Sequence, residues 1–242
     1  MVDLNPSLDV GPDCYSFVGS CSGLICLEKS FERGPSYICN PIMREYITLP
    51  RFEGYYKSGF GYSHSTKEYK VVRICLHPDK PNFSIFQVYT LGSSNGWRNL
   101  GEMEWKGMDL HGREVGVFAN EALHWVNQDK NNILAFHLAD EKFSELPLPP
   151  PMRNCYAMLG VLGDFLSVTY SDNRGGEIWL MEKNKNLSCW SKEIRFDSSG
   201  NGILWPFGYT RSRRFLLNGG SCRSKIYVFK SEASSTNIDF GK

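Results

Sequence analysis

Along most of this chain, polar and apolar positions follow a repeat that is closest to two residues. The segments Ser84–Tyr89 and Lys225–Lys230 show this pattern most clearly. No segment carries apolar residues at helical spacing over three turns, so the pattern predicts β-strands and very little helix. The 23 glycines and 12 prolines supply the residues for turns between short strands. We therefore expect more than about 40% of the chain in strands, well above the usual share.

Groups of short strand-like runs recur along the chain. The groups begin near Phe17, Gly59, Gly116, Met158 and Trp205, and successive starts lie 42 to 57 residues apart. Each group holds several short runs that are separated by turns. A period of about 40–50 residues with this content is the size of one β-propeller blade. The sequence thus predicts a single all-β domain of the β-propeller class, with five recognisable blade modules and, as an alternative left open, a partial sixth.

Two of these modules share an ending. A strand-like run leads into a Leu-Pro pair at Thr48–Pro50 and again at Leu146–Pro149. Proline has no amide hydrogen to donate to a neighbouring strand, so it ends the run there. We expect these prolines to mark the passage from one blade to the next.

Charge and hydropathy narrow the classes of partner. Lysine and arginine number 27 and aspartate and glutamate 26, a net charge of +1, which lacks the positive excess of a nucleic-acid or anionic-membrane binder. No apolar run approaches the roughly 18 residues of a membrane span, and the first residues lack the basic and apolar regions of a signal peptide. We expect a protein of the cytoplasm and/or nucleus whose eight cysteines are reduced, with no nucleic acid and no membrane as a partner.

Few residues of the sequence suggest a catalytic role. Glu102 and Glu104 lie two apart, so on a strand both carboxyls would face one side, as in a glycosidase acid pair, but an exposed strand face explains them better. Asp109 and His111 lie in a glycine-rich connection with no nucleophile near them in sequence. His124 is expected to satisfy a backbone partner. Because the cysteines and histidines also lack zinc-ligand spacing, we predict no enzyme activity, no cofactor and no metal site.

A cluster of arginines is one candidate for binding a protein partner. Arg211, Arg213 and Arg214 form a basic tip between two strand-like runs, and Arg223 follows in the next turn. Guanidinium groups in such a cluster are suited to an acidic partner segment. A solvated hairpin turn is the alternative interpretation.

Exposed aromatic residues are the second candidate. Tyr55 and Trp97 lie in or beside long connections, where aromatic side chains often anchor interfaces. The alternative is that they are core residues at blade junctions, which is the commoner role of aromatics there.

Several longer motifs occur in a fixed order along the chain. They are Gly19–Leu27, Cys39–Pro50, Gly59–Tyr62 with Thr66–Arg73, Asn120–Val126 with Ile133–Leu138, and Cys189–Lys192. From about Tyr15 to Phe229 the chain thereby resembles the plant F-box-associated domain. Met43 departs from the family pattern, which often has a small hydroxyl residue there. The resemblance implies a kelch-like β-propeller at residues 15–230, a lead segment at 1–14 and a C-terminal tail at 231–242. As an open alternative, this tail is a truncated last strand.

The resemblance also implies a function. In that family the domain follows an F-box in the substrate receptors of cullin-RING (SCF-type) ubiquitin ligases. The F-box docks the ligase adaptor, and the associated domain captures the protein to be ubiquitylated. Only about fourteen residues precede the first expected strand, too few for the helical F-box. We therefore expect a non-catalytic protein-recognition domain whose partner is the target for ubiquitylation, with the adaptor as a partner only if an F-box lies upstream.

Two alternatives stay open. A propeller hydrolase or oxidase with a small-molecule substrate would need convergent carboxylates or metal ligands in successive blades, which the sequence does not show. A decoy would bind the target without delivering it to a ligase. Because a rigid scaffold lets its loops vary independently, we expect binding through the loops on one face of the propeller.

Overall fold

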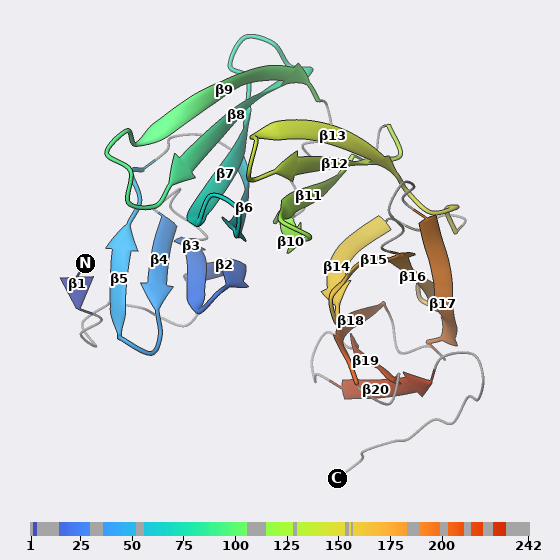
Figure 1. The fold of residues 1–242 in the computed structure, drawn as a ribbon. Coiled ribbons are helices and arrows are strands. Elements are labelled where there is room, and N and C mark those ends of the chain that lie inside the picture. Colours follow the sequence, from blue (N-terminus) through green and yellow to red (C-terminus); the bar gives the residue numbers. More distant parts are fainter. Residues whose placement is uncertain are drawn as a thin grey trace. The chain divides into compact units, whose positions relative to one another are not determined.

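The computed structural model describes residues 2–3, 15–29, 36–51, 56–105, 115–127, 130–152, 155, 157–182, 189–198, 203–210, 214–219 and 225–230 (Figure 1). These residues form twenty β-strands and no helix, and the strands cover about half of the chain. The all-β prediction is therefore confirmed. Within the described residues, no helix is available that could cross a membrane.

The strands form five sheets, which we number in chain order (Figure 1). Sheet 1 contains β1 (Val2–Asp3), β2 (Tyr15–Cys21), β3 (Leu24–Lys29), β4 (Ser36–Asn40) and β5 (Glu45–Thr48). Sheet 2 contains β6 (Tyr56–Ser63), β7 (Glu68–Leu76), β8 (Phe83–Thr90) and β9 (Trp97–Glu104). Sheet 3 contains β10 (Val117–Ala119), β11 (Ala122–Asn127), β12 (Asn132–His137) and β13 (Lys142–Pro147). Sheet 4 contains β14 (Ala157–Leu162), β15 (Phe165–Ser171), β16 (Gly175–Glu182) and β17 (Cys189–Asp197), and sheet 5 contains β18 (Leu204–Tyr209), β19 (Arg214–Gly219) and β20 (Lys225–Lys230).

Each sheet is an antiparallel meander in which strands that follow one another in the chain are hydrogen-bonded neighbours. The first strands of the five meanders, β2, β6, β10, β14 and β18, begin within three residues of the predicted module starts, which confirms the five modules. One strand breaks the order, because β1 pairs with β5 through Val2 and Tyr46. The expected lead segment 1–14 therefore contributes a short strand, and the expected tail 231–242 lies outside the described residues.

The chain divides into two compact units. Unit 1 comprises residues 1–125 and 135–144, and unit 2 comprises residues 126–134 and 145–242. Sheets 1 and 2 belong to unit 1, and sheets 4 and 5 belong to unit 2. The strands of sheet 3 contribute residues to both units, which are described separately below.

The core of unit 1 lies between sheets 1 and 2. Val18 and Cys26 of sheet 1 pack with Phe60 and Val71 of sheet 2, and all four side chains are buried. Strand β6, which provides Phe60, contacts β2 on one side and β10 on the other. Burial on both faces explains why β7 has a continuous run of buried residues instead of a strict alternation.

Two glycines allow a close approach within unit 1. Gly59 and Gly116 form a parallel bridge, and the Gly116 amide donates a hydrogen bond to the Ser58 carbonyl oxygen at 2.7 Å. The Trp125 ring covers both positions, since a Cβ atom would lie 2.9 Å from the ring at Gly59 and 2.5 Å from it at Gly116. Any larger residue would push the ring away, so glycine is required at both positions.

Unit 2 has two apolar clusters. In the first, Val126 and Ile133 pack with Ala157, Val168 and Tyr170 of sheet 4. In the second, the opposite face of sheet 4 packs on sheet 5; its buried members are Leu162, Ile178, Leu180, Ile194, Phe196, Leu204, Phe215 and Leu217. Sheet 4 is therefore buried on both faces, as an inner blade requires.

The Leu-Pro endings act as predicted. Strand β5 ends at Thr48, just before Leu49 and Pro50, and β13 ends at Pro147. Leu49 is buried, and its amide donates to the Ser36 carbonyl oxygen at 2.8 Å. Leu49 thus anchors the connection in the core, and both Leu-Pro endings lie where one sheet ends and before the next begins.

The described cysteine side chains are free thiols, namely Cys21, Cys26, Cys39, Cys75 and Cys155. Burial raises the pKa of Cys21 and of Cys75 to about 12. Thiols with such a pKa stay protonated near neutral pH and behave as small apolar residues.

Candidate functional site

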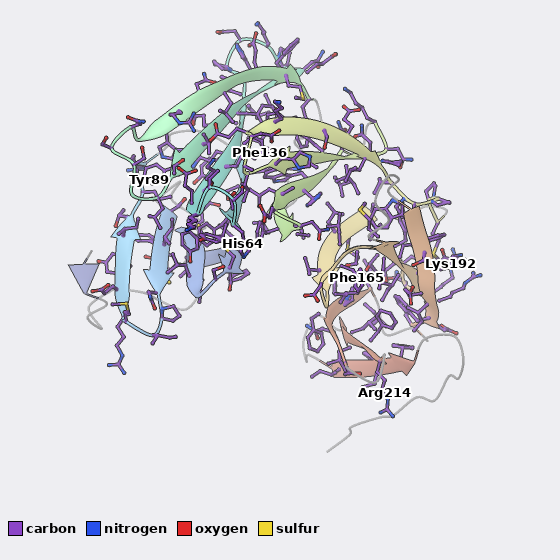
Figure 2. All side chains as sticks on the ribbon, in the orientation of Figure 1. His64, Tyr89, Phe136, Phe165, Lys192 and Arg214 are labelled. Atoms are coloured by element: carbon purple, nitrogen blue, oxygen red, sulfur yellow. The ribbon has the colours of Figure 1, made fainter. Side chains whose placement is uncertain are left out.

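Of the four arginines predicted to form a basic binding surface, the structure describes only Arg214, at the start of β19 (Figure 2). Its backbone amide donates to Thr210 Oγ1 at 3.0 Å, and its carbonyl oxygen accepts a hydrogen bond from the Thr210 amide at 2.9 Å. Arg214 therefore helps to close the β18–β19 hairpin. Arg211, Arg213 and Arg223 lie outside the described residues, so the basic tip stays a prediction.

Of the two predicted aromatic anchors, Tyr55 also lies outside the described residues, whereas Trp97 begins β9. The Trp97 ring is half-buried and stacks on the Arg73 guanidinium, 3.8 Å from the ring centroid. Its Nε1 donates to the Pro50 carbonyl oxygen at 3.2 Å, and its ring packs against Tyr89. Trp97 thus makes contacts inside unit 1, and its role in partner binding stays a prediction.

Arg73 is the centre of a buried polar cluster in unit 1. The side chain is fully buried, and the guanidinium also lies 4.6 Å from the centroid of the Tyr56 ring. Arg73 Nη2 donates to Ser36 Oγ at 3.3 Å. Burial lowers the pKa of Arg73 and raises the pKa of the neighbouring Glu28 carboxyl, each time because it disfavours the charged form. These residues come from sheets 1 and 2, so the cluster fastens the two sheets together.

The catalytic candidates have structural partners. Glu102 forms ion pairs with Lys80 and with His77 Nε2, the latter at 3.0 Å, and the hydrogen bond from Lys80 is the main cause that lowers the pKa of Glu102. Both Glu102 and Glu104 are exposed, as the strand-face interpretation expects. Asp109 and His111 lie outside the described residues.

His124 takes the backbone partner that was expected. The ring is buried, and its Nδ1 lies 3.2 Å from the Val117 carbonyl oxygen. Burial lowers the pKa of His124 to about 4, so the imidazole is neutral near pH 7 and donates through Nδ1. Within the part of the chain that the structure describes, no cluster of His, Cys, Asp and Glu could hold a metal ion.

A pocket of about 790 Å³ in unit 2 is the candidate binding site. It lies where β16 begins and β17 ends; its lining residues are Met152, Asp172, Arg174, Gly175, Gly176, Arg195, Phe196 and Asp197. The volume lies in the range of about 300–1,000 Å³ that is usual for ligand pockets. Because most of its lining comes from the β15–β16 turn and from the end of β17, loop chemistry determines what the pocket can bind.

The turn between β15 and β16 is held by Asp172. Asp172 Oδ1 accepts hydrogen bonds from the amides of Arg174 at 2.7 Å and Gly175 at 3.0 Å. The hydrogen bond from the Arg174 amide is the main cause that holds the pKa of Asp172 below its usual value. The Ser198 amide donates to the Arg174 carbonyl oxygen at 3.0 Å, so the turn is also tied to the end of β17. The pocket rim is therefore ordered by its own hydrogen bonds.

Two glycines allow the start of β16 to pack closely against the backbone of Tyr170 and Phe196. A Cβ atom at Gly175 would lie 2.2 Å from the Phe196 carbonyl oxygen, and one at Gly176 would lie 2.3 Å from the Tyr170 carbonyl oxygen. Both distances are far below van der Waals contact, so a larger residue at either position would displace backbone. The two glycines keep the backbone of this pocket lining close to Phe196.

The charged side chains of the pocket differ in how they are paired. Asp172 is occupied by the two amides, and Asp197 is also engaged. The Arg174 side chain is 89% exposed, and its Nε lies 3.7 Å from Asp172 Oδ2, which is a weak ion pair. Arg195 is exposed, and no ion pair or hydrogen bond of its side chain to another described residue is found. The pocket therefore presents guanidinium donors whose hydrogen-bonding capacity is mostly unused.

The sequence interpretation missed this pocket. The signal was present in Ser171–Gly176, where an Asp followed by Asn, Arg and two glycines is typical of an Asx turn. What the sequence could not show is that Arg195 lies near this turn. That depends on the register of β16 and β17, which places Glu177 opposite Arg195 and Gly175 opposite Asp197.

Five antiparallel meanders of blade size define this chain as an all-β scaffold of the propeller class. The family model described as F-box associated beta propeller domain matches residues 6–229, and the chain belongs to that family. The resemblance seen in the sequence motifs is thereby confirmed.

Related proteins come from Arabidopsis thaliana. The F-box protein At3g07870 is 28% identical over 212 residues, which cover 74% of this chain and 50% of that protein. The F-box/kelch-repeat protein At3g23880 is 27% identical over 198 residues, which cover 76% of this chain and 53% of that protein. This chain therefore spans about half the length of these relatives.

Solved structures show a likeness in fold. A virginiamycin B lyase from Staphylococcus aureus matches with a TM-score of 0.54 and 12% identity, over 94% of this chain and 70% of the lyase chain. A structure from a study of two prolyl endopeptidases matches with a TM-score of 0.54 and 13% identity, over 95% of this chain and 36% of the other. At this level of identity the likeness concerns the fold alone, and neither activity is carried over to this chain.

Proposed function

We propose that this chain captures a target protein without catalysis, as the substrate-recognition part of an SCF-type ubiquitin ligase receptor. The observation that carries the proposal is the match to the F-box associated beta propeller domain over residues 6–229. The relatives described above have names of F-box proteins. In the proposed setting, the ligase adaptor binds an F-box in a longer protein, and the complex works in the cytoplasm and/or nucleus.

The geometry supports recognition through loops. Buried sheets supply a rigid scaffold, and in unit 2 the pocket lies at a strand-to-strand turn on that scaffold. The pocket is mixed in character, with Met152 and Phe196 beside charged residues, so it offers both apolar and polar contacts to a peptide side chain. The titratable groups weighed for catalysis, Glu102 and His124, are instead engaged in ion pairs or a backbone hydrogen bond.

The proposal can be tested with two versions of the chain. The first is the chain alone, and the second is the chain fused behind an F-box. Proteins cross-linked to the immobilised chain in Arabidopsis extract are identified by mass spectrometry, and each is then purified and tested for direct binding. We expect at least one to bind both versions, whereas the ligase adaptor should bind only the fusion.

The effect on the target's lifetime is the decisive measurement. The F-box fusion should shorten the half-life of the bound target in plant cells, because it brings the target to the ligase. The chain alone should lengthen the half-life, because it occupies the target without delivering it. If no purified candidate binds directly, or if neither version changes the half-life of a bound protein, the proposal is wrong.

A further inference from the structure

The pocket in unit 2 carries an inference about what is recognised, and this inference rests on the proposed function. We propose that the pocket binds an anionic side chain of the target, a carboxylate or a phosphate, between Arg174 and Arg195. Some charged groups of the pocket are already paired, and others are available to a ligand.

The carboxylates of the pocket already have partners within the chain. Asp172 accepts two backbone hydrogen bonds at 2.7 and 3.0 Å, and these hold the β15–β16 turn. Asp197 is engaged as well. A cationic ligand would have to compete with these contacts, and at Asp172 such competition would loosen the rim of the pocket. A basic side chain is therefore a poor fit.

The carboxylate that could neutralise Arg195 is paired with a different residue. Glu177 lies directly opposite Arg195 in the β16–β17 register, which is the position where a cross-strand ion pair would form. Glu177 Oε1 instead lies 3.0 Å from Lys192 Nζ. The Lys192 ammonium also lies 4.8 Å from the centroid of the Trp179 ring, and Lys192 is labelled on β17 in Figure 2. These contacts leave the Arg195 guanidinium available.

The two arginines can reach one ligand. The Arg174 carbonyl oxygen accepts the Ser198 amide hydrogen bond, so Arg174 lies opposite Ser198, three positions along β17 from Arg195. At about 3.3 Å per residue this separation is about 10 Å along the chain, and both arginines line the same pocket, so a ligand in the pocket can contact both. A guanidinium has a planar fork of donors that matches carboxylate and phosphate oxygens.

The test measures binding of small probes to the whole chain by ¹H–¹⁵N NMR, with the amide signals of Gly175 and Gly176 as reporters. The probes are inorganic phosphate and three capped tripeptides, Gly-Asp-Gly, Gly-phosphoserine-Gly and the neutral Gly-Asn-Gly. We expect the anionic probes to shift both signals in a saturable way and the neutral tripeptide to leave them in place. Binding of the phosphate probes alone identifies a phosphorylated residue as ligand, and binding of the aspartyl tripeptide alone identifies an acidic residue.

Variants assign the binding to the two arginines. The double variant Arg174→Gln with Arg195→Gln should weaken binding of the anionic probes at least about tenfold, because charged hydrogen bonds are lost. Lys142→Gln is the matched control, since Lys142 is 77% exposed and lies outside the pocket, and it should leave binding unchanged. The inference is overturned if the neutral tripeptide binds as well as the anionic ones, if no probe shifts the two signals, or if the double variant binds as tightly as the wild type.

A failure of the proposed anion site can be distinguished from a failure of the proposed function. If the chain captures a target but the anionic probes do not bind, recognition stands and the assignment of the pocket is wrong. If the probes bind in the pocket but no target is captured, the anion site stands and the ligase role is wrong.

Discussion

At the scale of single residues, buried polar groups are placed where they join neighbouring sheets. Lys70 is almost fully buried in unit 1, and its Nζ donates to the Leu138 carbonyl oxygen at 2.7 Å and to Glu141 Oε1 at 2.9 Å. Arg98 donates to the same carboxylate oxygen at 2.6 Å. Burial alone would raise the pKa of Glu141, but the hydrogen bonds from Arg98 and Lys70 lower it. Each buried charge is thus held by partners that only the folded chain provides.

His124 should give the stability of the protein a recognisable pH dependence. Its pKa is lowered to about 4 in the folded chain from about 6.5 in the unfolded chain. Between about pH 4 and about pH 6.5 the unfolded chain binds more protons than the folded chain does. The stability that neutral His124 contributes is therefore fully present above about pH 6.5 and is lost as the pH falls toward about 4. We expect a loss of about 2 kcal/mol in the free energy of unfolding between about pH 8 and about pH 5, measured by urea denaturation.

His124→Gln is the control for this prediction. Glu28 changes the stability with pH in the opposite direction, because burial raises its pKa in the folded chain. The slope of the unfolding free energy against pH therefore contains both effects. The difference between the wild type and His124→Gln isolates the histidine. A variant with the same pH slope as the wild type would show that His124 is not the group responsible.

At the scale of elements, a tryptophan near the start of an outer strand is tied to the Leu-Pro ending that precedes its sheet. Trp97 at the start of β9 donates to the Pro50 carbonyl oxygen at 3.2 Å in unit 1. Trp190 near the start of β17 donates to the Pro147 carbonyl oxygen at 2.8 Å in unit 2. Because the same hydrogen bond occurs in both units, it is a repeated contact that holds the end of one sheet to the outer strand of the next.

Replacing these tryptophans should destabilise the chain by different amounts. Trp190→Phe removes one hydrogen bond to an exposed carbonyl oxygen, a loss of about 0.5–1.5 kcal/mol in the free energy of unfolding. Trp97→Phe should cost more, because the smaller ring also weakens the stacking on buried Arg73. Trp205→Phe serves as the control, since Trp205 is 50% exposed and its replacement should change the stability little. Equal urea denaturation curves for Trp190→Phe and Trp205→Phe would contradict the role of the hydrogen bond.

At the scale of the whole chain, sheet 5 has one face that the other described residues of unit 2 do not cover. Leu204, Phe215 and Leu217 point toward sheet 4 and are buried. On the alternate positions, Trp205, Phe207 and Ile226 are each about half exposed. Asn218, which is paired with Trp205 and Ile226 in the register, has a buried Oδ1 with no hydrogen-bond partner among the described residues. A sheet that is apolar on both faces is suited to burial on both faces.

The chain should therefore self-associate in solution. Sedimentation equilibrium should show an apparent mass that rises with protein concentration, and the double variant Trp205→Ser with Phe207→Ser should reduce this rise by removing apolar area from the exposed face. Phe17→Ser is the matched control, because Phe17 is 57% exposed but lies on sheet 1. A monomer at all concentrations would contradict the prediction. Association that the double variant leaves unchanged would point instead to pairing of strand edges, such as that of β20, which pairs with β19 alone among the described strands.

The sequence by itself determined the class of fold, because that depends on local patterns. Period-two runs, turn residues and the Leu-Pro endings each act within a few residues, and together they predicted five β-modules with starts that match β2, β6, β10, β14 and β18. The motifs of the F-box associated domain could also be recognised in the sequence, because each motif consists of residues that are close together in the chain. The backbone partner of His124 was also expected, because a histidine within an apolar run needs one.

Only the tertiary structure decided which residues meet across strands and sheets. From its place beside a long connection, Trp97 could be an exposed anchor or a core residue, and the structure places its ring on Arg73, 24 positions earlier in the chain. Arg195 looks like any exposed strand residue in the sequence. The strand register places Arg195 opposite Glu177, but Glu177 forms its ion pair with Lys192. The Arg195 guanidinium is therefore available to a ligand. Such pairings depend on distances between segments far apart in the sequence, and no local propensity encodes those distances.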